Sequence, residues 1–280
     1  MRALFLQRTH SLASPSHTVL LYVPAIYTSH TNTPNTPCRH SAKGYADLYQ
    51  TVLIDTPVGK YFSQFLVDSS SHLGAAAEIR SVLEEVEIEI IKSSLIKYWL
   101  EDFYEFCTGK VGGETGAIMA EVLMTRADTT AINITLNSFG TPLNEPSMRG
   151  SDRKRLYPAF GHLYPNGTNM LANVSDEESL GQVLTSFPQY AFAWSAHSGQ
   201  GGGEAKSIDD AFYERDVQLL ELAFESQMHF GCFYAYVKLK EQEIRNLVWI
   251  TECILQGQKE EISNFVPIFS QDAPWRSGRR

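Results

Sequence analysis

The sequence lacks a hydrophobic run long enough to cross a membrane. Its longest compact apolar stretch runs from Val19 to Tyr27 and contains Pro24, whereas a helix needs about 20 apolar residues to span a bilayer. We therefore expect no direct membrane span, and any membrane role would be peripheral. Basic charge is also scarce, because 23 Lys and Arg stand against 32 Asp and Glu, for a net charge of −9. Such an acidic chain binds polyanions poorly, which argues against a nucleic-acid partner.

Cysteine is scarce too, and it lacks the spacing of a metal module. The four cysteines form no C-x-x-C pair, and no histidine lies at zinc-ligand spacing from any of them. A disulfide framework or a zinc site is therefore not expected. The sequence predicts reduced thiols, no metal and no cofactor. The cysteines are Cys38, Cys107, Cys232 and Cys253.

Motifs for catalysis are also missing. Neither an H-E-x-x-H zinc motif nor a G-x-S-x-G nucleophile elbow occurs. The glycine-rich residues 109–116 do not form a P-loop motif, because Lys110 precedes the glycines and no Lys-Ser/Thr pair follows them. No catalytic residue is assigned. An enzyme that uses His162, His197 or the 109–116 loop stays open as an alternative.

The two ends of the chain differ in composition from the rest. Acids are absent before Asp47, and the first residues are basic and rich in hydroxyl groups. Such a composition is typical of an organelle transit peptide. The alternative, which we favour, is a disordered or artefactual leader over residues 1–44. Residues 270–280 carry three arginines and one acid without periodicity, and we interpret them as a tail.

Between these ends, helical periodicity dominates and predicts an all-α fold. The clearest helix is expected over residues 75–107, with Gly109 as its left-handed C-terminal residue. Six large apolar residues recur along it at steps of three and four, and we expect them to form a core stripe. The stripe consists of Ile88, Ile91, Leu95, Trp99, Phe103 and Phe106.

A second helix is expected over residues 117–138, although the alternation at residues 131–136 could also form a strand. Residues 141–205 hold five prolines and read as irregular. One short helix is expected there, at 175–187, with Ser175 and Glu178 as its capping box. The same region carries a basic cluster that could contact an acidic partner surface: Arg153, Lys154 and Arg155.

The last third predicts two more helices, over residues 208–228 and 230–256. Glu241 and Arg245 stand four residues apart with the acid first, the favourable order for an ion pair on a helix. Each helix carries one apolar face. The faces are Val217, Leu220, Phe224 and Met228 on the first, and Phe233, Val237, Ile244, Val248, Thr251 and Leu255 on the second.

Residues 228–254 closely resemble the signature of the d subunits of vacuolar-type proton ATPases. Within this block, residues 240–247 also resemble the core motif of the related C subunits of archaeal-type rotary ATPases. The signature residues are Lys240, Glu241, Glu243, Arg245 and Asn246. Further blocks agree in the family's order, at residues 53–57, 88–91, 100–107, 134–141, 155–158, 163–167 and 264–269.

The resemblance implies an all-helical bowl of three lobes that has no active site. In this family the bowl sits on the cytosolic face of vacuolar or other acidic endomembranes as a peripheral subunit. It couples the central stalk to the proteolipid ring, so that ATP hydrolysis drives proton transport. The match covers about residues 45–269. We expect two of the three lobes, at about 45–145 and 146–269, with the first lobe missing and the N-terminus incomplete.

Two further consequences follow from this resemblance. Apolar side chains near residues 49–65 would lose the cover of the missing lobe, which predicts exposed apolar surface there. The proteolipid ring and the central-stalk subunits would be the partners. The alternatives are a helical scaffold binding module unrelated to proton pumping, or a non-functional fragment.

Overall fold

The computed structural model describes residues 56–73, 88–199 and 207–270. The regular elements in these ranges are helices, and no described residue forms a strand. The all-α prediction is therefore confirmed. The expected leader and all but the first residue of the expected tail lie outside the described ranges.

The chain forms two compact units that meet in sequence between Lys92 and Ser93. The lobe boundary expected near residue 145 lies within the second unit, and the division into lobes stays a prediction. In the first unit, helix α4 spans Gly59–Leu73. Its Phe62 and Phe65 are buried, with ring centroids 6.1 Å apart. The exposed apolar surface expected near residues 49–65 is therefore not found at these two side chains.

Helix α6 spans Ile88–Glu105 and continues into a π-helical turn, Phe106–Val111. The left-handed residue that ends this turn is Gly112, with φ of 64°, and not Gly109 as the sequence predicted. The difference arises because the chain adds a π-helical turn before it reverses, so the helical segment ends later than the apolar stripe. Residues 75–87 of the expected helix lie outside the described residues.

The expected core stripe on α6 is only partly buried. Ile91 is buried, whereas Phe106, the first residue of the π-helical turn, is 46% exposed. Trp99 and Phe103 stack at 5.5 Å and are half-buried. Leu95 is also half-buried, and the side chain of Ile88 lies outside the described part. Leu100, on the face of α6 next to this stripe, is the side chain that is fully buried.

Helix α7 spans Gly113–Ser138, so its predicted C-terminal residue is confirmed and its start lies four residues earlier than expected. Residues 131–136 are helical, which excludes the alternative strand. Gly116 allows α7 to begin close to the π-helical turn, because a Cβ there would lie 2.9 Å from the carbonyl oxygen of Cys107. Leu100, Cys107, Met119 and Leu123 form the small core between α6 and α7.

The middle of the chain is more regular than its prolines suggested. Pro146 starts a short helix, and Pro165 directly precedes another, because proline is tolerated at helix N-termini. The middle contains a 3₁₀ turn Pro142–Asn144 (η3), α8 Pro146–Met148, a π-helical turn Arg149–Arg153 (η4), α9 Asn166–Asn173, α10 Glu177–Ser186 and α11 Ala191–His197.

The expected capping box at the start of α10 is shifted by one residue. Asp176 caps the helix, because its carboxylate accepts a hydrogen bond of 2.8 Å from the backbone N–H of Ser179. The Ser179 hydroxyl in turn lies 3.3 Å from the N–H of Asp176. The predicted pair of Ser175 and Glu178 is therefore wrong.

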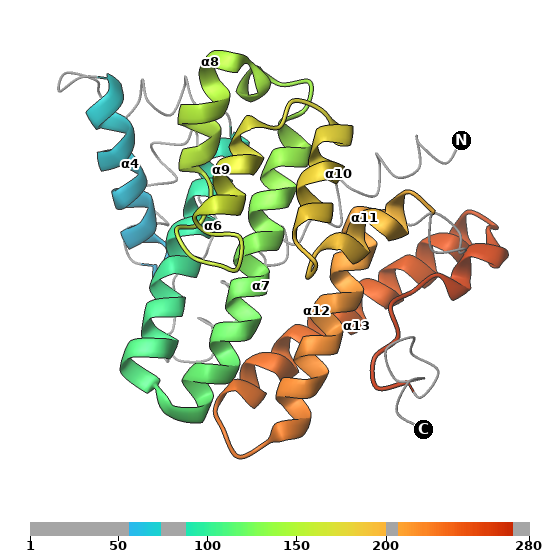
Figure 1. Ribbon diagram of the computed structural model, residues 1–280. Helices are drawn as coiled ribbons and strands as arrows, with labels where there is room; N and C mark the ends of the chain where they lie inside the picture. The colour runs from blue at the N-terminus through green and yellow to red at the C-terminus, as the bar shows by residue number, and fades with distance from the viewer. Residues whose placement is uncertain (1–55, 74–87, 200–206, 271–280) are drawn as a thin grey trace, which may run out of the picture. The chain divides into compact units, whose positions relative to one another are not determined.

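Helices α12, Ile208–Ser226, and α13, Gly231–Leu255, form the second long hairpin, drawn in orange in Figure 1. Val217 and Leu220 of the expected α12 face are buried, whereas Met228 lies beyond the helix end and is 95% exposed. On α13, small side chains such as Ala235 face α12. The apolar face expected on α13 points elsewhere, and its members are exposed.

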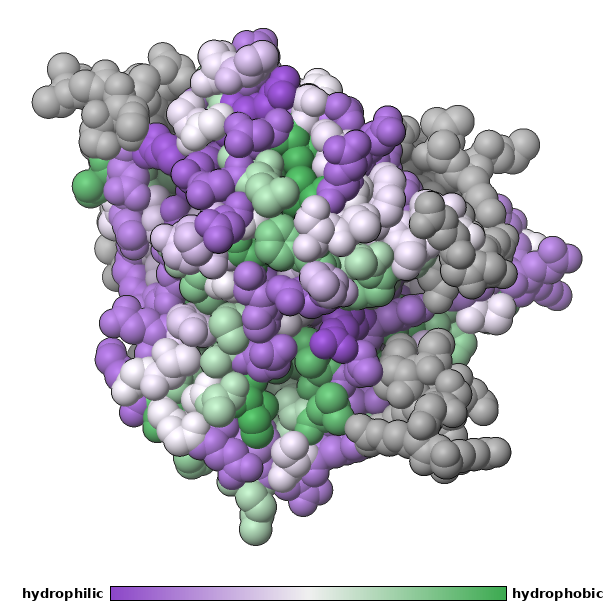
Figure 2. Space-filling view, viewed as in Figure 1, coloured by the Kyte–Doolittle hydropathy of each residue, from purple (hydrophilic) through white to green (hydrophobic). Residues whose placement is uncertain are grey.

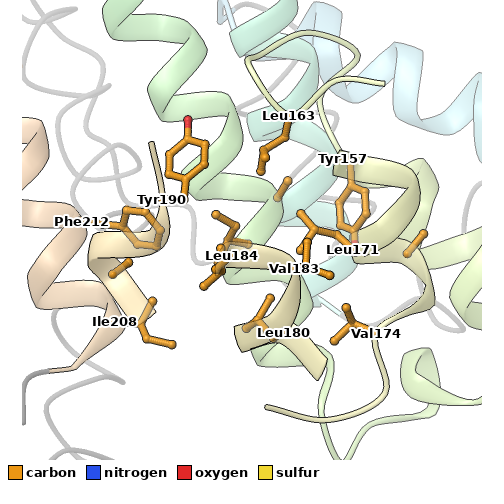
Figure 3. Packing of buried hydrophobic residues seen from close by; sticks show 14 of the residues in the cluster. Tyr157, Leu163, Leu171, Val174, Leu180, Val183, Leu184, Tyr190, Ile208 and Phe212 are labelled. Atoms are coloured by element: carbon orange, nitrogen blue, oxygen red, sulfur yellow. The ribbon is translucent and has the colours of Figure 1, made fainter. Parts of the chain in front are cut away.

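A larger core joins α7 to α9, α10, α11 and α12 (Figure 3). Figure 2 shows polar residues over most of the visible face, with apolar residues reaching the surface in its upper centre and in its lower part. The buried members of the core are Ala131, Ile132, Tyr157, Leu163, Leu171, Ala172, Val174, Leu180, Val183, Leu184, Tyr190, Ala193, Ile208, Ala211 and Phe212.

Candidate functional site

The basic cluster at residues 153–155 is divided by burial. Arg153 is fully buried, so the expectation that it contacts a partner is wrong. Its sequence neighbours Lys154 and Arg155 are exposed. The charge pattern alone did not reveal this, because adjacent residues on a helical turn face different directions.

Arg153 instead holds the end of α9. Its Nη2 donates to the carbonyl oxygens of Leu171, Ala172 and Val174 at 3.0, 2.9 and 2.7 Å. These carbonyls lie at and just beyond the helix C-terminus, where carbonyl groups lack intrahelical partners and a cation is favourable. Nη1 adds bonds to Ser138 Oγ at 3.0 Å and Asn144 Oδ1 at 3.2 Å. Burial lowers the pKa of Arg153, but a guanidinium stays protonated in proteins.

The signature residues on α13 divide between the surface and the interior. Lys240 and Glu243 are exposed and form an ion pair of 2.6 Å with each other. Glu241 pairs with Lys238 at 2.8 Å. Arg245 therefore does not form the expected pair with Glu241.

Arg245 lies over the ring of Tyr213 on α12, 4.1 Å from its centroid, and donates to Gln242. The next signature residue, Asn246, donates a hydrogen bond of 2.7 Å from its Nδ2 to the carbonyl oxygen of Val266. That bond holds the segment that follows α13 against the helix. Trp249 acts alongside it, because its indole N–H donates to the carbonyl oxygen of Glu261 at 3.1 Å.

Arg126 on α7 and Asp216 on α12 complete this group, with 3.3 Å between Nη1 and Oδ2. Burial alone would lower the pKa of Arg126, but Asp216 and the other acidic groups nearby outweigh it and raise the pKa. Burial raises the pKa of Asp216 despite the attraction of Arg126. Burial also lowers the pKa of Lys238 against the opposing effect of Glu241.

We call these residues the signature cluster. They join α7, α12 and α13, and all of them are half-buried. Their charges pair with one another between the three helices, and such partly desolvated ion pairs fix the crossing geometry of the helices more than they add stability. The cluster consists of Arg126, Tyr213, Asp216, Lys238, Glu241 and Arg245.

A second polar group surrounds Asp128 on α7, which is 1% exposed. Its carboxylate accepts from the backbone N–H of His162 at 2.8 Å and of Leu163 at 3.2 Å, and from Tyr190 Oη at 2.5 Å. Burial raises the pKa of Asp128, while these donors oppose the rise. Gly161 is required beside it, since a Cβ there would lie 2.2 Å from Oδ1.

Sequence patterns did not single out Asp128, Tyr190, Arg126 or Asp216. For Asp128 a signal existed, because the residue stands three and four positions before Ala131 and Ile132, which are buried on the same helix. An acid at a core position of an amphipathic helix indicates a buried partner. For the other three residues the sequence carries no local signal.

The two histidines considered as catalytic candidates each lie beside a different glutamate. His162 Nε2 lies 3.5 Å from Glu121 Oε1, and His197 Nε2 lies 2.7 Å from Glu177 Oε1. The glycine-rich residues 109–116 form the end of the π-helical turn and the first turn of α7. Within the described ranges, no cluster of three or more His, Cys, Asp or Glu side chains is close enough to hold a metal ion.

None of the helices described here is both long enough and apolar enough to cross a membrane.

Comparison with known proteins gives consistent relatives. Residues 33–265 match the family described as ATP synthase (C/AC39) subunit. The chain is 42% identical over 224 residues to the V-type proton ATPase subunit d of Dictyostelium discoideum, covering 80% of this chain and 57% of that protein. It is 43% identical over 225 residues to subunit d1 of Arabidopsis thaliana, with 80% and 58% covered.

A more distant relative is the V-type proton ATPase subunit d of Saccharomyces cerevisiae, 33% identical over 233 residues, with 83% of this chain and 61% of that protein covered. The chain thus spans about three-fifths of the length of the relatives it matches. The signature cluster on α7, α12 and α13 lies within the matched region.

Proposed function

We propose, since this chain belongs to the ATP synthase (C/AC39) subunit family, that it is a non-catalytic subunit of the membrane sector of a vacuolar-type proton ATPase. In this role it couples the central stalk to the proteolipid ring, so that ATP hydrolysis drives proton transport. The names of its relatives support the assignment to this pump.

The observation that carries the proposal is the signature cluster. A coupling subunit has to transmit torque without deforming. The ion pair of Arg126 with Asp216 connects α7 to α12, and the contact of Arg245 with the ring of Tyr213 connects α13 to α12. Closely packed helices joined by half-buried polar contacts deform little under load. The long helices and their mutual contacts therefore suit a role in mechanical coupling better than a role in catalysis.

The proposed partners are the proteolipid ring and the central-stalk subunits. The proposed location is the cytosolic face of vacuolar or other acidic endomembranes, as a peripheral subunit. Lys154 and Arg155 are exposed at the surface. They are the part of the basic cluster that we propose for contact with an acidic partner surface.

Affinity purification of the tagged full chain from its source cell tests this proposal. Recovery of proteolipid-ring and stalk subunits supports it. Recovery of other proteins in their place would favour a helical scaffold unrelated to pumping, and recovery of nothing specific would favour a non-functional fragment.

Charge reversal of Lys154 and Arg155 to Glu sharpens the same experiment. The recovered pump subunits should decrease for this variant and should persist for Lys110→Glu, the matched control at another exposed lysine. An equal decrease for both variants would contradict the assigned contact.

A further inference from the structure

Helix α13 carries an exposed stripe with a seven-residue repeat. Seven positions follow one another at steps of 4, 3, 4, 3, 4 and 3 residues, and each of them is exposed. Five are large and apolar, with exposed fractions between 44% and 67%. The seven are Phe233, Val237, Lys240, Ile244, Leu247, Thr251 and Ile254. We call them the α13 seam.

The spacing of the seam is that of a coiled coil rather than of a helix that packs on a globular core. A sustained seven-residue repeat keeps one narrow stripe facing a partner helix. The step order makes Val237, Ile244 and Thr251 the a positions, all of them β-branched. The d positions are then Phe233, Lys240, Leu247 and Ile254.

The opposite side of α13 is buried inside the protein. Ala235 and Leu239 pack with α12, and Gln242 and Cys253 are buried as well. The α12–α13 hairpin therefore does not account for the seam. Val248 and Leu255 lie beside it, 53% and 75% exposed, and widen it into a contiguous apolar surface. A surface of this kind marks an interaction site on a soluble domain.

The charge within the seam indicates the chemistry of its partner. Lys240 occupies a central d position, and its hydrogen bond to Glu243 raises its pKa, so the ammonium stays charged. A partner that covers this position favourably presents a carboxylate to it, because opposite charges attract across an interface. A polar residue at a core position also fixes the register. A second copy in parallel register would place Lys240 against Lys240, which is unfavourable.

We propose that the α13 seam docks a single amphipathic helix of another polypeptide, with an apolar seven-residue repeat and a carboxylate opposite Lys240. The seam is defined by α13 alone, and this inference does not rest on the proposed role in a proton pump. Helices that dock in this way are recognised by apolar anchors, and charged positions select among them.

Two synthetic helical peptides of three heptads test the inference against the full chain. Both carry Leu and Ile at the repeat, and they differ only in a Glu or a Lys at the position that faces Lys240. Fluorescence anisotropy at low salt measures their dissociation constants. The Glu peptide should bind about two- to fivefold more tightly than the Lys peptide, the range of one partly exposed ion pair.

Two variants of the chain complete the design. Lys240→Glu should reverse the preference between the peptides, and Leu247→Asp should weaken binding of both by about tenfold or more, because it places a charge in the apolar seam. Met170→Asp on α9 is the matched control at an exposed apolar residue and should leave binding unchanged. Circular dichroism confirms that each variant is folded.

Three outcomes would overturn the inference. The first is no binding of either peptide at millimolar concentration, and the second is an unchanged preference in Lys240→Glu. The third is a dimer of the chain, detected by analytical ultracentrifugation, that Leu247→Asp dissociates, since a second copy would then be the occupant.

Discussion

Arg126 on α7 and Asp216 on α12 are 90 residues apart in sequence and meet at 3.3 Å across the two helices. Their side chains are 28% and 21% exposed, so water screens the pair only in part. Around them lie Tyr213, Tyr234 and Glu241 from α12 and α13. The pair is therefore the centre of the signature cluster that fixes the crossing of these helices.

Removal of one partner of this pair should destabilise the fold. We expect Arg126→Met to lower the free energy of unfolding by about 2–4 kcal/mol, because it leaves the Asp216 carboxylate partly buried without its cation. Urea denaturation followed by circular dichroism measures the loss. The double variant Arg126→Met/Asp216→Leu should recover part of it, and a double loss equal to the sum of the single losses would contradict the coupling.

Substitution of Arg153 should remove the hydrogen bonds at the C-terminal end of α9 and lower the free energy of unfolding. Arg153→Met leaves three carbonyl oxygens without their donor, which should cost about 3 kcal/mol or more. Arg153→Lys should cost less, because an ammonium keeps the charge but lacks the planar fork. The same urea experiment checks both, with Lys154→Ala expected within about 0.5 kcal/mol of the parent chain. An equally large loss in Lys154→Ala would show that the effect does not arise from burial.

A methyl group at position 161 should disturb Asp128. Gly161 has φ of 128°, and its added Cβ would lie 2.2 Å from Asp128 Oδ1. We expect Gly161→Ala to cost about 2–3 kcal/mol through backbone strain and overpacking. Gly150→Ala is the matched control, because a Cβ there meets nothing within 4 Å. Thermal unfolding should separate the two variants, and similar melting temperatures would contradict the geometry around Asp128.

Asp128 should also change the pH dependence of stability. Burial raises its folded-state pKa above the unfolded value of about 3.9. Between these two values the folded chain binds more protons than the unfolded chain, so the Asp128 contribution to stability grows as the pH falls through this interval.

The comparison of the parent chain with Asp128→Asn isolates this contribution. The stability of the parent relative to the variant should increase as the pH is lowered from 7 towards the unfolded pKa of about 4. Urea midpoints at each pH measure it. A relative stability that decreases over this range would indicate a lowered rather than a raised pKa in the folded state.

The sequence predicted the helices well and their faces less well. Periodicity located α7, α12 and α13 to within a few residues, since long amphipathic patterns have few alternatives. It did not indicate which apolar face of α13 is covered. Phe233 and Val237 are exposed while Ala235 is buried, because small side chains let α12 approach closely and hydrophobicity alone does not register that.

The polar groups were the hardest to predict. Arg153 looked like an exposed charge beside Lys154, and only the fold brings the end of α9 to its guanidinium. Arg126 and Asp216 lie far apart in sequence, so no local pattern connects them. Resemblance singled out Glu241 and Arg245, but their contacts with Lys238 and Tyr213 became evident only in three dimensions.

The proposed coupling of ATP hydrolysis to proton movement is tested most directly by the ratio of the two rates. ATP-driven acidification and ATP hydrolysis are measured together on acidic membrane vesicles from cells depleted of the protein. We expect proton uptake per ATP hydrolysed to fall sharply on depletion and to recover when the protein is restored. An unchanged ratio after complete depletion would contradict the coupling role.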